Sequence, residues 1–472
     1  MKNIKRRSNR RLSKVGIALL AIFLLAFFIR LLPLLMHGHP IGMDAYYHFR
    51  QAEEFKSGFP EYDALSMGGR PYSYWPTFHV FLAGMSLLTT LPVEIIGPII
   101  VTLIGSITVL IIFLITRHIF RDNKAALLSA AFSAVIPVFL WKTASNTLVT
   151  SIDIFLFATV LLFVLQDKKL QYFVTSIILF AFSPATGILG LSLYAFTLKK
   201  NRLNRSTIIW IALLVIFVLI SLSFYADFTK IYVSKDLPED VNKTLYEKIS
   251  IEGFLLRLNP AMLALGIAGL YSQRKRYRQF LPVVALLVFF AIAFVAEFLE
   301  TDRALVYLGI FLSIFTGVAL SKIRPKSYAP ILIAVIFVAS LALGVYSLKY
   351  LEWSAISDYD YDALTWIKYN TPTDAVIMAA PVEGHWVTYV SQRKNIVDSN
   401  LLGAQDLAER YNDVKTFYHT SNLSARDEIT NKYNVSYVVF SEKAIAFDPQ
   451  FDVFGWYEIA YQNTTATVFR VT

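Results

Sequence analysis

The sequence predicts a polytopic α-helical membrane protein with a small α/β domain at its C-terminal end. Hydrophobic residues make up 56% of the 472 residues, and charged residues make up only 17%. A spanning helix needs roughly 20 mostly apolar residues, and runs of this kind recur between residues 15 and 348 and then stop. A soluble domain rarely sustains this balance over such a length, so we expect most of the chain to lie in a bilayer.

About eleven apolar segments are candidate spans. They are residues 15–36, 95–116, 125–141, 150–166, 170–183, 185–198, 207–225, 258–272, 279–298, 304–320 and 328–348. The first is too long for a signal peptide and lacks a small-residue cleavage site, so we expect it to be retained as a span. The segment 77–91 is apolar but short and carries His79. It is either a twelfth span or a helix lying at the membrane interface.

Lys and Arg residues lie in short clusters between the apolar segments, which is typical of topology signals and not of a nucleic-acid surface. If the N-terminus is cytoplasmic and 77–91 does not cross, every later basic cluster is also cytoplasmic. These clusters are 117–124, 168–169, 199–205, 274–278 and 322–326, and the outside segments are 37–94, 142–149, 226–257, 299–303 and the tail from 349. We therefore expect a multi-pass cell-membrane protein with a cytoplasmic N-terminus, an extracytoplasmic C-terminal domain and no nucleic-acid partner.

The chain divides into two predicted domains, a transmembrane domain with functional outside loops at 1–348 and a soluble α/β domain at 349–472. In the second, the 360–370 stretch has apolar residues at helical spacing, whereas 374–380, 435–441 and 465–471 have the composition of strands. The sequence contains no cysteine. This excludes disulfides, zinc-thiolate sites and thiol catalysis.

The first outside loop contains a carboxylate at a useful place. Its sequence HGHPIGMDAYYHFR puts Asp44 just beyond the first span, followed by Tyr46, His48 and Arg50. Oxygen ligands suit Mg²⁺ and Mn²⁺, so Asp44 is well placed to hold such an ion against a lipid-linked phosphate. The alternative, which the spacing favours equally, is a solvated acid that caps the next helix.

The GMDAYYHFR segment resembles the catalytic subunits of archaeal oligosaccharyltransferases, which are membrane enzymes of the GT-C glycosyltransferase class. GRPYSYWPTFHVFLAG is similar to the aromatic and proline segment before an external helix in that family, in agreement with the charge argument that 77–91 does not cross. The resemblance implies a GT-C-like helical bundle, a polyprenyl-linked glycan donor and a Mg²⁺ or Mn²⁺ cofactor bound by Asp44. It also implies substrate contacts for Tyr46, His48 and Arg50.

Two further residues are identified through the same resemblance. Thr244 to Glu247, with the sequence TLYE, resemble a family motif whose Glu orients the acceptor, so Glu247 is a catalytic candidate; the alternative is an ordinary loop tetrapeptide. Arg303 begins an apolar segment, as does the family's Arg that binds the lipid diphosphate, and a fixed fork of donors suits that task. The alternative for Arg303 is an anchor at the membrane boundary.

The sequence departs from the family at two motifs. DAVIMAAPVEGHWVTYVSQRKNIVDSN is similar to the region around the family's WWDYG motif, but the five motif positions hold Ala380, Pro381, Val382, Glu383 and Gly384. Glu383 and His385 are the substrate-binding candidates there. The family's second acidic pair falls on 148–150, which has no acid, and the nearest is Asp153. Asp153 is either a displaced metal ligand or a structural acid facing the bundle interior.

Together these features predict a divergent, metal-dependent membrane glycosyltransferase. It would move a glycan from a polyprenyl phosphate or diphosphate to an acceptor, with the Asn of a protein sequon as the leading acceptor. One alternative is a GT-C transferase that acts on a lipid or surface polymer, which the altered WWDYG region favours. Another is a non-catalytic membrane relative with a degenerate site, which the missing second acidic pair favours.

Overall fold

The structure, a computed structural model, describes residues 2–72, 74–197, 205–232, 249–296, 300–400, 406–447 and 457–471. The chain forms two compact units. The helical unit comprises residues 1–33, 98–223 and 246–353, and the mixed unit comprises residues 34–97, 224–245 and 354–472. Three α-helices have residues in both units, namely α1 (Lys2–His37), α4 (Val93–Phe120) and α10 (Arg205–Tyr232), as does the 3₁₀ helix η3 (Leu348–Ser354).

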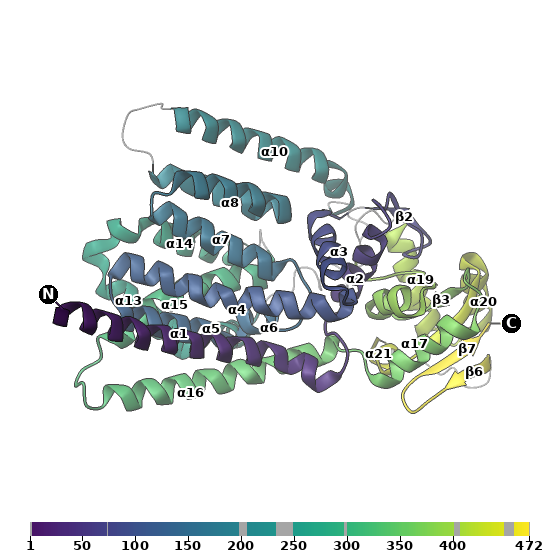
Figure 1. The fold of residues 1–472 in the computed structure, drawn as a ribbon. Coiled ribbons are helices and arrows are strands. Elements are labelled where there is room, and N and C mark those ends of the chain that lie inside the picture. Colours follow the sequence, from purple (N-terminus) through teal and green to yellow (C-terminus); the bar gives the residue numbers. More distant parts are fainter. Residues whose placement is uncertain are drawn as a thin grey trace. The chain divides into compact units, whose positions relative to one another are not determined.

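In the described residues, the helical unit contains helices and no strand, and most of its long helices run side by side (Figure 1). Its other elements are α5 (Asn123–Ala134), α6 (Pro137–Thr143), α7 (Thr150–Leu165), α8 (Lys169–Phe182), α9 (Pro184–Ser192), η1 (Leu193–Thr197), α12 (Ile251–Leu258), α13 (Pro260–Ser272), η2 (Arg274–Phe280), α14 (Leu281–Val295), α15 (Thr301–Ser321), α16 (Ala329–Ser347) and η3 (Leu348–Ser354).

The chain is a polytopic helical membrane protein. Five helices of the described residues are long and apolar enough to cross a bilayer, or seven if each of two bent pairs counts as one span. Each of the eleven apolar segments expected from the sequence coincides with helical structure, but several of these helices, α7 and α8 among them, have fewer than 18 residues. The figure of eleven spans therefore stays a prediction.

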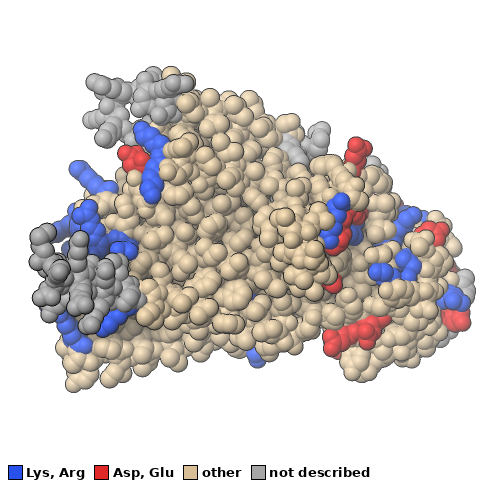
Figure 2. Space-filling view, viewed as in Figure 1, with Lys and Arg blue, Asp and Glu red and all other residues tan. Residues whose placement is uncertain are grey.

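Charge is unevenly distributed on the helical unit. Most of the visible surface of this unit is uncharged, and its Lys and Arg residues gather mainly at one end (Figure 2). The N-terminus of α1 and the turns from α13 to α14 and from α15 to α16 lie at that end (Figure 1). This agrees with the positive-inside pattern used above. The cytoplasmic position of that end remains a prediction.

Two helix pairs are sharply bent, and the sequence explains both bends. The axis turns by 61° between α5 and α6 and by 75° between α12 and α13. Pro137 and Pro260 each occupy the first turn of the second helix, where a missing N–H costs nothing, while the residue before a proline disfavours the helical conformation. Asn259 adds a cap, because its side chain accepts from the N–H groups of Ala261 and Met262.

A buried arginine holds the first of these bends. The Arg30 side chain is fully buried in the helical unit. Its Nη1 donates to the carbonyl oxygen of Ala134, the last residue of α5, at 3.2 Å. Its Nε donates to Thr143 Oγ1 on α6 at 2.8 Å. An arginine inside an apolar bundle is stable only with such partners, so α1 supplies bonds that the broken helix has lost.

Glycines allow the helices to pack closely around α15. A Cβ added to Gly317 of α15 would overlap Ser129 Oγ and the carbonyl oxygen of Ala125 on α5. A Cβ added to Gly269 of α13 would overlap the carbonyl oxygen of Phe315. In a bilayer the helices gain little from the hydrophobic effect and associate through such close backbone approaches. These glycines therefore place α5 and α13 directly against α15.

The mixed unit combines the first loop of the chain with the C-terminal segment. Its elements are α2 (Met43–Phe55), β1 (Tyr62–Asp63), β2 (Arg70–Pro71), α3 (Thr77–Thr89), α17 (Asp358–Asn370), β3 (Val376–Met378), η4 (Pro381–Glu383), α18 (Gly384–Trp386), η5 (Val387–Ser391), β4 (Lys394–Asn395), α19 (Leu407–His419), α20 (Leu423–Tyr433), β5 (Val435–Phe440), α21 (Glu442–Phe447), β6 (Glu458–Gln462) and β7 (Thr467–Arg470).

A five-stranded sheet forms the core of the mixed unit. Its strand order is β4-β3-β5-β7-β6. The pairs β3–β4 and β3–β5 are parallel, and the pairs β5–β7 and β6–β7 are antiparallel. Phe417 and Tyr418 of α19 pack with Val438 of β5 and Phe469 of β7 in one buried apolar cluster. The predicted helix at 360–370 and the predicted strands at 374–380, 435–441 and 465–471 are all present.

Candidate functional site

Asp44 lies in the first turn of α2, at the surface of the mixed unit. The chain enters α2 through Gly42, whose φ of 101° favours glycine. A bridge between Ile41 and Ala355 fixes this entry point. The Asp44 side chain is exposed, and its Oδ1 accepts a hydrogen bond from Ser399 Oγ at 3.1 Å. The sequence left open whether Asp44 only caps α2, but its contact with Ser399 engages it with the C-terminal segment.

The residues that follow Asp44 are buried. Tyr46 donates to the carbonyl oxygen of Pro40 at 3.0 Å, and the Arg50 guanidinium forms two parallel bonds of 2.6 Å each to Asp63. Such a pair is strong and geometrically specific. Tyr46 and Arg50, which the resemblance assigned to substrate binding, are thus engaged inside the mixed unit. The sequence pattern gave no sign of Asp63 as the partner.

A second buried arginine continues this network into the C-terminal segment. Arg70 Nη2 lies 3.4 Å from Asp398 Oδ1 and Arg70 Nε lies 3.9 Å from Asp63 Oδ2. Ser66 also donates to Asp398. Burial raises the pKa of Asp398, but Arg70, His385 and Ser66 together lower it to about 2. The alternating acids and bases connect α2 and β2 to the segment after β4, and Asp398 stays ionised.

His385, predicted to bind substrate, lies inside this network. Its side chain is fully buried, its Nδ1 is 3.6 Å from Asp398 Oδ2, and its ring centroid is 5.3 Å from that of Tyr47. Within the described residues neither ring nitrogen has a hydrogen-bond partner. Burial lowers the pKa of His385, against the opposite effects of Asp398 and Asp44. The imidazole is therefore neutral, and it lies on α18 against Tyr47 of α2, the helix that carries Asp44.

Glu383 occupies the altered WWDYG region and is bound within the mixed unit. Its Oε1 accepts from Ser441 Oγ at 2.5 Å and its Oε2 accepts from the Ala380 N–H at 3.2 Å. Burial raises the pKa of Glu383 to about 8. Both oxygens are thus occupied, and the carboxyl group is mostly protonated at neutral pH.

His48 is part of a hydrogen-bonded group that sequence reasoning did not recognise. Its Nδ1 lies 2.7 Å from His79 Nε2, and His79 Nδ1 lies 2.5 Å from the Tyr72 hydroxyl. A histidine within the apolar helix α3 was the one signal available from the sequence, because such a side chain needs polar partners when it is buried.

In the helical unit, Asp153 is buried on α7. Its Oδ2 accepts hydrogen bonds from Tyr307 on α15 at 2.9 Å and from Thr186 on α9 at 3.1 Å. Its Oδ1 is buried and has no hydrogen-bond partner within the described part of the chain. The first observation fits a structural acid that faces the bundle interior. The second fits an acid with one oxygen left for a cation.

Arg303 lies in the first turn of α15, one turn before Tyr307, among other charged groups of the helical unit. Arg303 Nε is 3.6 Å from Glu300, which also binds Lys142 at 2.7 Å. Arg257 Nε is 3.0 Å from Asp302. Among the described residues, three cations and two acids therefore meet at this end of α15.

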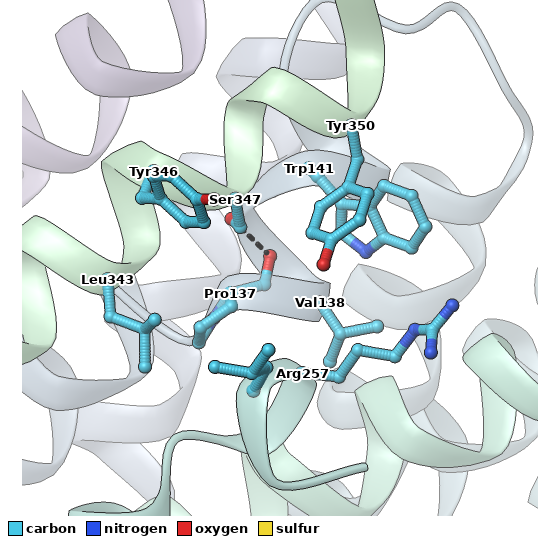
Figure 3. Close-up of a pocket in the computed structure, with 9 residues that line it drawn as sticks. Pro137, Val138, Trp141, Arg257, Leu343, Tyr346, Ser347 and Tyr350 are labelled. Atoms are coloured by element: carbon cyan, nitrogen blue, oxygen red, sulfur yellow. Dashed lines mark hydrogen bonds between the residues drawn. The ribbon is translucent and has the colours of Figure 1, made fainter. Parts of the chain in front are cut away.

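An apolar pocket adjoins this cluster between α6, α12 and α16 (Figure 3). It is lined by Pro137, Val138, Trp141, Leu256, Arg257, Leu343, Tyr346, Ser347 and Tyr350. The Lys142 ammonium and the Arg257 guanidinium lie 5.4 Å and 5.9 Å from the Trp141 ring centroid. Aromatic and basic side chains combined in this way are typical of the membrane interface.

The sequence-predicted site residues thus fall into two groups. Asp153 and Arg303 lie in the helical unit, whereas Asp44, Tyr46, His48, Arg50, Glu383 and His385 lie in the mixed unit. Glu247 lies outside the described residues. No three His, Asp or Glu side chains within the described ranges converge on one metal position. The predicted meeting of Asp44, Glu247 and Arg303 stays a prediction.

Comparison with known proteins gives similar folds. No protein-family model and no curated protein sequence matches the chain. The archaeal oligosaccharyltransferase AglB from Archaeoglobus fulgidus, solved with an inhibitory peptide and a dolichol-phosphate, is similar with a TM-score of 0.66 and 16% identity over 90% of this chain and 69% of that one. Another structure of an oligosaccharyltransferase from Archaeoglobus fulgidus, in complex with zinc and sulfate, has a TM-score of 0.64, with 17% identity over 96% of this chain and 73% of that one.

A further similar structure is ArnT from Cupriavidus metallidurans bound to undecaprenyl phosphate. Its TM-score is 0.59, with 14% identity over 96% of this chain and 97% of that one. The arabinofuranosyltransferase AftD from Mycobacteria has a TM-score of 0.54, with 14% identity over 97% of this chain and 41% of that one. At these identities the similarity shows a shared fold.

Proposed function

The chain has the fold of the GT-C glycosyltransferases in a divergent form, and we propose that it is a membrane glycosyltransferase with a polyprenyl phosphate or diphosphate donor. Two solved structures of similar fold hold dolichol-phosphate and undecaprenyl phosphate. The observation that carries the proposal is the exposed Asp44 carboxylate, which begins α2 and is engaged by Ser399. The bilayer supplies the donor, and the acceptor is a protein or a lipid.

In the proposed reaction, the bond between the glycan C1 and the phosphate oxygen breaks while an acceptor N–H or O–H group attacks C1. The leaving phosphate gains negative charge. Arg303 would neutralise that charge with a fork of donors that is always protonated. Glu247 would hold the acceptor group in line. Tyr46 and Arg50 would support the start of α2, because their polar groups already have partners in the mixed unit.

We also propose that Asp44 and Asp153 bind a divalent cation, Mg²⁺ or Mn²⁺. The donor chemistry fits, because both residues offer carboxylate oxygens and Asp153 Oδ1 is buried with no hydrogen-bond partner in the described residues. When bound, such an ion would stabilise the developing charge of the leaving phosphate. The complex of the Archaeoglobus enzyme with zinc and sulfate supports the binding of a cation, and it does not identify the ion as Mg²⁺ or Mn²⁺.

The leading acceptor is the Asn of a protein sequon. One structure of the Archaeoglobus enzyme, with a TM-score of 0.63 and 14% identity, is tethered to a peptide that contains an NVT sequon. A lipid or surface-polymer acceptor is the second candidate. Glu383 favours it, because both oxygens of this side chain are bonded inside the mixed unit and are not directed to a peptide.

The test is transfer in vesicles that contain the purified protein, Mn²⁺ and a lipid-linked glycan, with a sequon peptide or a lipid as acceptor. We expect Asp44→Ala to abolish transfer and Asp358→Ala, which removes a carboxylate that is 79% exposed in the same unit, to preserve it. Normal transfer by Asp44→Ala would refute the catalytic role of Asp44. Transfer to the lipid alone would remove the sequon proposal.

Cation binding distinguishes the proposed metal-dependent enzyme from a non-catalytic relative with a degenerate site. Calorimetry with Mn²⁺ on the wild type and on Asp44→Asn should show a heat of binding that the variant lacks. Equal heats would mean that Asp44 is not a ligand.

A further inference from the structure

Two buried histidines and a half-buried tyrosine of the mixed unit form a continuous hydrogen-bonded chain. His48 Nδ1 on α2 lies 2.7 Å from His79 Nε2 on α3, and His79 Nδ1 lies 2.5 Å from the Tyr72 hydroxyl. A neutral imidazole has one N–H and one lone pair, so His79 uses both of its ring nitrogens in the chain. The exposed fractions of the His48 and His79 side chains are 3% and 0%. We call these three residues the ring chain.

The two ends of the ring chain have different surroundings. His48 follows Asp44 by four residues on α2, which places the two side chains one turn apart on the same helix face. At the other end, Tyr72 packs edge-on against Phe55 at 5.5 Å. The residue before Phe55 is Glu54, whose side chain is 32% exposed. Burial raises the pKa of Tyr72, and the charge of Glu54 adds to this effect, so the Glu54 carboxylate lies within electrostatic range of the Tyr72 hydroxyl. The ring chain thus extends from the face that carries Asp44 toward this partly exposed carboxylate.

Packing alone does not explain the ring chain. The rings of Tyr47, Tyr74 and Phe78 surround the two histidines at centroid distances of 5.0 to 6.2 Å. Phenylalanine at positions 48 and 79 would fill this aromatic cluster without burying polar nitrogens, whose burial costs free energy unless each finds a partner. The histidines therefore provide something that apolar rings would not, namely a connected set of exchangeable protons.

The protonation states suit proton transfer. Burial, together with His385, lowers the pKa of His48 to about 3. Burial, together with His48 and Arg50, holds the pKa of His79 well below its usual value. Burial also raises the pKa of Glu54, against the effect of Arg50. Both imidazoles are therefore neutral at physiological pH. Each can accept a proton at one ring nitrogen while it releases one from the other.

We propose that His48, His79 and Tyr72 conduct the proton that the acceptor loses during glycosyl transfer from the Asp44 end of α2 to the surface beside Glu54. This inference rests on the proposed function. It assigns roles to His79 and Tyr72 and gives His48 a role beyond contact with substrate.

The proton balance is complete. Before transfer, His48 Nδ1–H donates to His79 Nε2, and His79 Nδ1–H donates to the Tyr72 oxygen. When the acceptor bonds to C1 and the C1–O bond to phosphate breaks, the acceptor proton binds His48 Nε2. The Nδ1 proton of His48 moves to His79, the Nδ1 proton of His79 moves to Tyr72, and the Tyr72 hydroxyl proton passes to Glu54 or water. One proton enters, one leaves, and no ring stays charged.

The decisive variant is Tyr72→Phe, which keeps the aromatic ring and removes the hydroxyl where the proton leaves. With wild-type protein and variants in vesicles, we expect the transfer kcat to fall about 10-fold or more, since general acid–base groups contribute roughly 10²-fold to 10⁴-fold. The KM values for donor and acceptor should stay unchanged. The kcat should also rise with pH and show a larger solvent deuterium isotope effect, because the proton must then leave directly to water.

Two further measurements separate proton conduction from structural support. His79→Gly opens space beside His48, and added imidazole should restore at least part of its kcat in a concentration-dependent manner. Tyr74→Phe is the matched control, because the Tyr74 ring packs on both histidines at 5.1 and 5.2 Å. We expect this control to keep the wild-type pH profile and isotope effect. A Tyr72→Phe variant with wild-type kcat, pH profile and isotope effect would overturn the proposal.

The proposal would likewise be overturned if imidazole does not restore the kcat of His79→Gly and the lower kcat of Tyr72→Phe comes with an unaltered pH profile and isotope effect. Both residues would then have a structural role. The outcome for the proposed function is separate. If Asp44→Ala abolishes transfer while Tyr72→Phe is normal, proton conduction fails and the glycosyltransferase proposal stands. If Asp44→Ala transfers normally, the catalytic site itself is misassigned.

Discussion

Tyr307 on α15 donates a hydrogen bond of 2.9 Å to the buried carboxylate of Asp153 on α7. We expect Tyr307→Phe to lower the free energy of unfolding by about 1.5–3 kcal/mol, because the buried carboxylate then loses one of its hydrogen-bond donors. Unfolding in detergent would measure it. Tyr346→Phe, at a position that is 56% exposed in the same unit, should change little. Equal stability of both variants would contradict the prediction.

Close packing at Gly317 predicts a steric effect. We expect Gly317→Ala to destabilise the protein by about 1–3 kcal/mol, since its methyl group would overlap Ser129 and the Ala125 carbonyl group on α5. Gly84→Ala in α3 is the control, because nothing lies within 4 Å of its added Cβ. This control should be neutral or stabilising by up to about 1 kcal/mol. Thermal unfolding of both variants measures the difference, and a stable Gly317→Ala would show that α5 and α15 can separate.

Glu383 predicts a pH dependence of stability. Since the folded state raises the pKa of this carboxyl from 4.5 to about 8, the folded state holds the proton more tightly between these values. Stability is therefore lost as pH rises through that window. We expect Glu383→Gln, which keeps the neutral shape, to gain stability relative to wild type as pH rises from 5 to 8. Melting temperatures at both pH values provide the measurement, and parallel curves would refute the assignment.

The two parallel bonds between Arg50 and Asp63 predict that a positive charge alone at position 50 does not give full stability. Arg50→Lys keeps the positive charge but loses one of the two parallel bonds, so we expect a loss of about 1–3 kcal/mol. Arg470→Lys is the control, because Arg470 pairs with Glu458 at the surface, where both side chains are at least half exposed. Exposed pairs contribute little. If denaturant unfolding gives Arg50→Lys the same free energy of unfolding as wild type, the two-bond geometry does not contribute to stability.

The proposed role of Arg303 predicts that its removal impairs the use of the phosphate donor. If it neutralises the phosphate, Arg303→Ala should raise the donor KM or lower kcat/KM by about 10-fold to 100-fold, since a hydrogen bond to a charged group contributes about 1.5–3 kcal/mol. Lys322→Ala, which removes a cation at the opposite end of α15, should leave transfer unchanged. Equal kinetics of the two variants would identify Arg303 as a membrane anchor only.

Much of the fold followed from patterns that are local in the chain. Apolar runs predicted the helices, and β-branched stretches predicted β3, β5 and β7. The strand β6 was missed because its sequence EIAYQ lacks a regular apolar alternation and most of its side chains are at least partly exposed. The helix α19 was missed because LAERYNDVKTFYH is largely polar, with only Leu407, Val414, Phe417 and Tyr418 buried. In both cases tertiary packing, not local composition, defines the element.

The candidate site was less predictable, because its contacts join distant residues. Ser66 and Asp398 are 332 positions apart, and Asp44 and Ser399 are 355 positions apart. The sequence identified Asp44 from its position after a span, but it gave no sign of Asp63 or Arg70 as partners. For Asp153 the structure supports the structural interpretation through Tyr307, and it leaves one oxygen for the ligand interpretation.

Arg30 has a consequence for any shortened form of this protein. Its side chain satisfies the carbonyl group at the end of α5, and its own carbonyl oxygen accepts from Ser145 beyond α6. Removing the first helix would thus leave the carbonyl group at the end of α5 and the Ser145 hydroxyl without these partners. It would also remove one membrane-spanning helix. Expression designs that trim the N-terminus should therefore stop well before residue 30, whatever fusion partner replaces the missing segment.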